Sequence, residues 1–62
     1  MSFAEAIRKE RKRLGLNQSE AAALLEVSFE AVSKWERGLS EPPKITQEGA
    51  LARLLAMKGR KK

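Results

Sequence analysis

Residues 15–38 read GLNQSEAAALLEVSFEAVSKWERG, a stretch that predicts two short helices joined by a tight turn. Asn17 is a capping residue directly before the first of them, which we expect to cover residues 18–25. Ser28 is placed to cap the second, which we expect to cover residues 28–37 and to end at a glycine. Helices this short are marginal in isolation, so both must pack against other parts of the chain.

Two further helices are predicted on either side of this stretch. In the first, over about residues 3–14, apolar residues recur at helical spacing. Residues 39–43 contain two prolines and are expected to form a loop. Thr46 is the expected cap of the last helix. The inward stripe of that helix is expected to contain Leu51, Leu54 and Leu55.

Length and composition favour one small helical domain. The chain has 62 residues, and its apolar content of 42% depends mainly on alanine and leucine, which favour helices. We therefore expect an all-α fold, a compact bundle of four helices, with a fifth helix as an alternative. The expected organisation is a single domain over residues 1–58, followed by a basic C-terminal tail over residues 59–62.

The charge balance favours a polyanionic partner and the composition argues against catalysis. Thirteen Lys and Arg residues against eight Glu residues give a net charge of +5 and a pI near 10.1. Without Cys or His, the chain has no thiol nucleophile, no histidine base and no usual zinc ligands. We expect no catalytic residues, no metal and no cofactor. No apolar run approaches the roughly 18 residues of a membrane span, so we expect a cytoplasmic protein with no membrane partner.

Residues 15–38 resemble, without a gap, the DNA-binding domains of phage repressor and Cro-type regulators, the Xre-like helix-turn-helix family. The resemblance implies a λ repressor-like fold, with the helix-turn-helix at about residues 18–37 and a double-stranded DNA operator as the partner. It also implies that Val32 and Trp35 anchor the second helix of the motif in the core. Glu26 occupies a turn position that is most often glycine in this family, where left-handed backbone is common.

Arg11 lies on the stripe of the first helix that should face the core. A charge in that position needs a partner. The resemblance implies a structural ion pair between Arg11 and Glu36. A solvated Arg11 or a phosphate contact is the alternative.

The outward positions of the helix over residues 28–37 are the candidate contacts to bases. An aromatic ring packs on the thymine methyl, a carboxylate accepts from cytosine N4, and lysine donates to guanine. Alternatives are a partly buried Phe29 that packs against the turn, and a Glu30 that only complements the helix N-terminus. The candidate base contacts are Phe29, Glu30, Ser33 and Lys34.

Phosphate contacts are expected from helix starts and from the loop after the second helix of the motif. The predicted residues are Gln18, Ser28, Arg37 and Lys44. The basic run over residues 8–13 is either a phosphate patch or a solvated face of the first helix. The basic tail is expected to add salt-sensitive affinity that does not depend on DNA sequence.

Together these features predict a sequence-specific transcriptional regulator, a repressor of the phage or bacterial Cro/C1 type, without a small-molecule ligand. High specificity usually needs two domains on half-sites about 34 Å apart, so we expect a homodimer on DNA. Leu39, Ile45 and Met57 are the expected dimer contacts. The alternative function is an antitoxin-type helix-turn-helix protein that binds a partner protein and represses its own operon.

Overall fold

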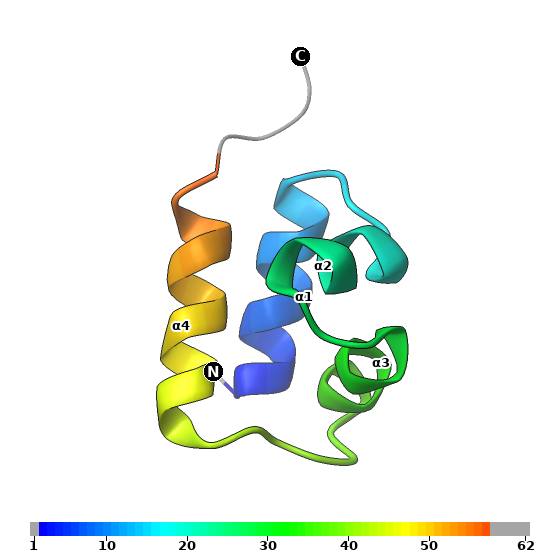
Figure 1. Cartoon of the computed structure of the whole chain (residues 1–62), viewed down its shortest axis with the longest axis vertical. Helices are drawn as coiled ribbons and strands as arrows, with labels where there is room; N and C mark the ends of the chain where they lie inside the picture. Colours follow the sequence, from blue (N-terminus) through cyan, green and yellow to red (C-terminus); the bar gives the residue numbers. More distant parts are fainter. Residues whose placement is uncertain (1, 58–62) are drawn as a thin grey trace.

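The computed structural model describes residues 2–57, in which four α-helices and no strand are formed. The helices are α1 (Phe3–Arg13), α2 (Gln18–Leu25), α3 (Phe29–Arg37) and α4 (Lys44–Leu55). α1 runs through the middle of the bundle, with α4 on one side of it and α2 and α3 on the other (Figure 1). The predicted all-helical bundle is confirmed. The predicted basic tail lies outside the described residues.

Local caps fix where the first three helices begin. Ser2 and Glu5 form a capping box at the start of α1, and Asn17 and Glu20 form another at the start of α2. The Ser28 hydroxyl accepts a hydrogen bond from the backbone N–H of Ala31 at 3.0 Å. Each cap satisfies backbone donors that have no partner inside the helix. The predicted starts of these helices are therefore confirmed.

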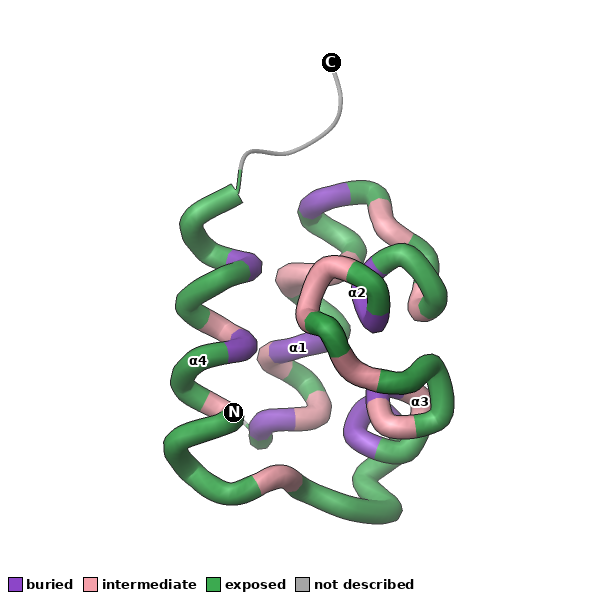
Figure 2. Tube along the Cα trace, in the orientation of Figure 1, coloured by how far each residue is buried: buried purple, intermediate pink, exposed green. Residues whose placement is uncertain are grey.

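The core lies where the inward faces of the helices meet around α1. Figure 2 shows that the buried segments of α1 and α4 face each other and that α3 buries the side turned towards the bundle. Phe3 and Trp35 pack edge to face with ring centroids 5.7 Å apart, an arrangement that ties α3 to the start of α1. The largest fully buried side chains are those of Ile7, Leu14, Val32 and Leu54.

The start of α4 differs from the prediction. The helix begins at Lys44, directly after Pro43, so the prediction that Thr46 caps it is wrong. Pro43 occupies the capping position in an extended conformation and makes no side-chain cap. The Gln47 side chain instead donates to the Pro42 carbonyl at 2.9 Å, which fastens the loop to the first turn of the helix.

The inward stripe of α4 also differs in part from the prediction. Leu54 is fully buried and Leu51 is half-buried, but Leu55 is 61% exposed, so its assignment to the core is wrong. Ala50 is buried in its place. α4 packs on α1 along one side only, and the stripe it buries is correspondingly narrow (Figure 2).

The turn between α2 and α3 keeps a left-handed residue although that residue is not glycine. Glu26 has φ 62° and ψ 40°, and it is the only non-glycine residue with positive φ among residues 2–57. Its backbone N–H donates to the Ala23 carbonyl at 3.2 Å, and the N–H of Val27 donates to Ala22 at 3.0 Å. The turn thus retains the backbone geometry that glycine would adopt without strain.

We expect Glu26→Gly to stabilise the domain by about 1 kcal/mol, because glycine removes the strain of left-handed backbone and loses only part of that gain through unfolded-state entropy. The Glu26–Arg53 ion pair that is lost spans 3.9 Å between two exposed side chains and contributes little. Urea unfolding followed by circular dichroism measures the change. Glu41→Gly is the control, since the φ of Glu41 is not positive. A destabilised Glu26→Gly variant would contradict this interpretation.

Candidate nucleic-acid interface

One side of α3 holds the helix to the domain. Val32 is fully buried, and Trp35 and Glu36 are 7% and 5% exposed. These residues recur at helical spacing, so they fix which side of α3 faces the bundle. The remaining side chains of the helix are left for solvent or for a partner.

The predicted base-contacting residues lie outside this buried side or at its edge. Phe29 is 51% exposed, Glu30 and Lys34 are exposed, and Ser33 is half-buried. This exposed fraction of Phe29 fits both the base contact and the alternative of a partly buried Phe29 that packs against the turn. Within residues 2–57, neither Glu30 nor Lys34 forms an ion pair with another side chain. The first turns of α3 therefore present a half-exposed aromatic ring together with an exposed carboxylate and an exposed ammonium group that form no ion pair within residues 2–57.

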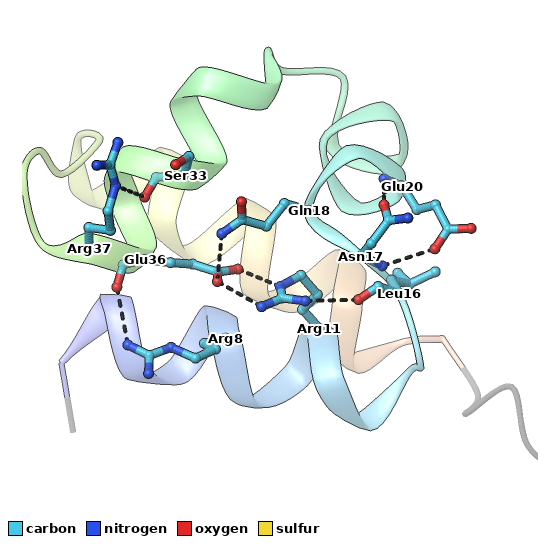
Figure 3. A network of polar contacts seen from close by, with 9 residues as sticks. All are labelled: Arg8, Arg11, Leu16, Asn17, Gln18, Glu20, Ser33, Glu36 and Arg37. Atoms are coloured by element: carbon cyan, nitrogen blue, oxygen red, sulfur yellow. Dashed lines mark hydrogen bonds and ion pairs between the residues drawn. The ribbon is translucent and has the colours of Figure 1, made fainter.

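The structure brings Arg11 and Glu36 together, as the family resemblance implied. The guanidinium binds the carboxylate through two hydrogen bonds, Nε to Oε2 at 2.7 Å and Nη2 to Oε1 at 2.9 Å (Figure 3). Arg11 Nη1 also donates to the carbonyl of Leu16 at 2.9 Å, beyond the end of α1. This two-point geometry is the strong form of a charge pair. The pair connects α1 to the end of α3.

The environment of Glu36 favours its ionised form. Burial alone would raise the pKa of Glu36, but the hydrogen bonds from Arg11 and Gln18 and the charges of Arg11 and Arg8 outweigh it and lower that pKa. The hydrogen bond to Glu36 raises the pKa of Arg11, against the opposite effect of desolvation. Both groups are therefore charged at neutral pH, and each is the other's main partner.

The predicted phosphate contacts lie at the ends of helices. Lys44 is exposed at the start of α4, and Ser28 lies at the start of α3. Arg37, at the end of α3, donates from Nε to the Ser33 carbonyl at 3.4 Å. Gln18 behaves differently, because its side-chain Nε2 donates to Glu36 Oε1 at 3.2 Å (Figure 3). One donor of Gln18 is thus committed to the interior of the domain.

Arginines in the basic run of α1 have a role that the sequence did not reveal. Arg8 Nη2 donates to the backbone carbonyl of Glu36 at 3.1 Å, at the end of α3. Arg13 Nη2 donates to the carbonyl of Leu54 at 3.0 Å, at the end of α4. The last carbonyls of a helix lack partners within it and carry partial negative charge, so each contact satisfies a helix end. Arg8 and Arg13 therefore connect helices to one another. The choice between a phosphate patch and a solvated face, which the sequence left open for residues 8–13, now concerns only the lysines among them.

Arg53 makes the same kind of contact from α4. Its Nη1 donates to the carbonyl of Leu24 at 3.0 Å, near the end of α2. By contrast, Lys9, Lys12, Lys34 and Lys44 form no ion pair within residues 2–57. The described arginines therefore bond to backbone carbonyls, whereas the described lysines stay available to an anionic partner. Local sequence signals do not predict the contacts of Arg8, Arg13 and Arg53, because their acceptors belong to other helices.

A family model described as helix-turn-helix matches residues 7–56, most of the chain and parts of all four helices. The chain belongs to the Cro/C1-type helix-turn-helix family. Comparison with curated proteins and with solved structures gave no match. α2 and α3 are the two helices of the motif, and the αL residue Glu26 lies in the turn between them.

The helix-turn-helix family is a DNA-binding family and not an enzyme family. The family match supports a DNA-binding function of the transcription-regulator type. Over residues 2–57, no helix is long and apolar enough to cross a bilayer. In the same part of the chain, no group of three or more His, Cys, Asp or Glu side chains is placed to hold a metal ion.

Proposed function

We propose that this helix-turn-helix domain binds double-stranded DNA in a sequence-specific way and regulates transcription as a repressor. The observation that carries the proposal is the division of α3. Val32, Trp35 and Glu36 are buried against the domain, whereas Lys34 is exposed on the opposite side and Phe29 is 51% exposed at the edge of the buried side. A helix anchored on one side and chemically varied on the other is suited to the major groove, which admits an α-helix.

Each free side chain of α3 has a base-edge partner of matching chemistry. Phe29 is suited to the methyl group of thymine, Glu30 to the N4 amine of cytosine, and Lys34 to O6 and N7 of guanine. Glu30 also repels the phosphates around the groove, so it favours discrimination between sequences over raw affinity. Ser33 is half-buried and contributes a shorter hydroxyl contact.

Phosphate contacts set the position of α3 without reading sequence. In this proposal they come from Gln18 and Ser28 at helix starts and from Arg37 and Lys44 at the two ends of the loop after α3. The exposed, unpaired ammonium of Lys44 is the strongest electrostatic contributor among them. Such contacts make the affinity fall steeply with salt.

A single domain covers a small footprint, so we propose that two copies bind together on DNA. Leu39 and Ile45 are 65% and 79% exposed, and Met57 is 38% exposed. Exposed apolar side chains of this size are candidates for burial against a second copy. Two domains related by a two-fold axis would read half-sites about 34 Å apart.

The proposal predicts different effects for two lysine substitutions. Lys34→Ala removes a base contact, so it should weaken binding to the preferred site by about 1–3 kcal/mol and relax the choice of base at one position. Lys44→Ala removes a phosphate contact, so it should weaken binding to all duplexes similarly and lower the salt slope by about 1. Fluorescence anisotropy with a preferred and a scrambled duplex, titrated at several salt concentrations, separates the two effects.

Lys9→Ala is the matched control, because Lys9 is an exposed, unpaired lysine on α1 and lies outside the predicted contacts. It should change neither base preference nor affinity for the preferred duplex beyond the small effect of net charge. Equal losses for Lys34→Ala on preferred and scrambled duplexes would overturn the assignment of Lys34 to a base contact. Failure of the wild type to bind any duplex at low salt would overturn the proposed function.

A further inference from the structure

We propose that Glu36, which is too buried to touch DNA, is a positioning residue for DNA binding because it aims the side-chain amide of Gln18 at a backbone phosphate. The inference rests on the proposed function, in which Gln18 contacts a phosphate. It adds a role for Glu36 beyond holding Arg11. The side chain of Glu36 is 4% exposed, so any effect on DNA must pass through another residue.

The carboxylate of Glu36 is itself rigidly placed. Arg11 holds both of its oxygens, at 2.7 and 2.9 Å, and Arg8 binds its backbone carbonyl at 3.1 Å. Gln18 Nε2 lies 3.2 Å from the same oxygen, Oε1, that Arg11 Nη2 reaches (Figure 3). A fixed acceptor therefore lies within reach of a flexible glutamine at the start of α2.

The chemistry of the two groups determines how the amide is oriented. An ionised carboxylate only accepts hydrogen bonds, so Gln18 must turn its nitrogen rather than its oxygen towards Glu36. The amide nitrogen carries two protons, and one of them is donated to Oε1. The second proton is left to donate to an acceptor outside the domain. In the flipped orientation, which Glu36 disfavours, the amide oxygen would face and repel a phosphate.

The contact between Gln18 and Glu36 also lowers the entropy cost of DNA binding. A glutamine in solution loses rotamer freedom when it forms a phosphate contact, whereas Gln18 is already held before DNA arrives. The network also joins three helices, through Arg11 of α1, Gln18 of α2 and Glu36 of α3. The carboxylate of Glu36 thereby sets both the phosphate contact at the start of α2 and the placement of α3.

Nuclear magnetic resonance tests the geometry in the wild-type domain. The chain has side-chain amides only at Asn17, Gln18 and Gln47, so the three pairs of NH2 signals are assigned by substitution of each residue. In the free domain, we expect one proton of Gln18 Nε2 to be shifted downfield by the carboxylate. On addition of a duplex, the other proton should shift, while the NH2 signals of Gln47, bonded to the Pro42 carbonyl, serve as the reference.

A double-mutant cycle tests the positioning role in binding. Gln18→Ala should weaken duplex binding about tenfold in the wild type, the effect of one hydrogen bond to a charged group. In a Glu36→Gln background, where residue 36 has a single side-chain oxygen left, the same change should cost less than about threefold. Binding is measured at a low temperature at which circular dichroism shows that every variant is folded. Gln47→Ala is the control, and its effect should be the same in both backgrounds.

The possible outcomes separate this inference from the proposed function. If the duplex shifts backbone signals of α3 but leaves the Gln18 amide unchanged, or if the cycle shows no coupling, the positioning role is wrong and the proposed function stands. If the duplex shifts no signals at all, the proposed function fails. Should Glu36→Gln not fold, the response of the wild-type Gln18 protons still decides the inference.

Discussion

Replacing Glu36 with leucine should destabilise the domain by about 3–5 kcal/mol, because it leaves the charge of Arg11 buried without its partner. The side chain of Arg11 is only 13% exposed. A domain of this size has a total stability of about 3–9 kcal/mol, so the loss is comparable to the whole. Urea unfolding or a thermal melt followed by circular dichroism measures the effect. Much of the Glu36→Leu population should be unfolded at room temperature.

The control is the removal of both charges. Arg11→Met combined with Glu36→Leu leaves no unpaired charge and fills the space with apolar groups, so most of the stability should return. Glu26→Gln is a surface control, because the Glu26 side chain is 80% exposed and its partner Arg53 is also exposed. It should change stability by less than about 0.5 kcal/mol. A Glu36→Leu variant as stable as the wild type would refute the structural role of the ion pair.

The same pair makes the wild-type stability depend on acid. The pKa of Glu36 is lower in the folded protein than its ordinary value in the unfolded chain. Its contribution is therefore fully present above that ordinary pKa and is lost as the pH falls through the folded pKa. Urea unfolding between pH 7 and pH 2 should show this acid loss in the wild type, and the double variant should lack the part that is due to Glu36.

Replacing all four predicted base contacts by alanine should reduce binding at the preferred site about 1,000-fold, to the level of non-specific DNA. The variant is Phe29→Ala, Glu30→Ala, Ser33→Ala and Lys34→Ala combined. Its net charge stays at +5, because one Glu and one Lys are removed together, so the non-specific affinity should survive. Alanine favours helix, and these side chains are not buried, so the fold should be retained. Anisotropy titrations on preferred and scrambled duplexes give both affinities.

A charge-matched variant away from α3 provides the comparison. Lys9→Ala with Glu48→Ala also removes one charge of each sign, from exposed positions on α1 and α4. It should leave the preference for the selected site intact. The account of α3 would be untenable if this variant lost specificity, or if the fourfold α3 variant kept it.

Local sequence features predicted the helix-turn-helix closely, because its signals are themselves local. The start of α2 follows from the capping box of Asn17 and Glu20, which acts within one turn. Arg11 was also informative, because a charge on an apolar stripe needs a buried partner. The left-handed backbone of the turn, by contrast, is kept although residue 26 is a glutamate. The packing of α2 against α3 therefore outweighs the preference of glutamate for negative φ at this position.

Features that depend on distant parts of the chain were not predictable in this way. Thr46 is a good capping residue, yet α4 starts at Lys44 because the extended Pro43 leads directly into the helix. Leu55 matches the apolar stripe of α4, but α1 covers only a narrow part of that helix. The carbonyls that hold Arg8 and Arg13 lie on helices remote in sequence. Such contacts are set by the tertiary fold and leave no local pattern.

The central claim is that α3 reads the sequence of double-stranded DNA. Selection from a pool of randomised duplexes, with the wild-type domain at moderate salt, tests it most directly. The account predicts one enriched sequence, made of two symmetric halves about one helical turn, or about 34 Å, apart. The fourfold α3 variant should fail to enrich it. A wild-type selection that enriches no sequence, although the domain binds the pool at low salt, would contradict the claim.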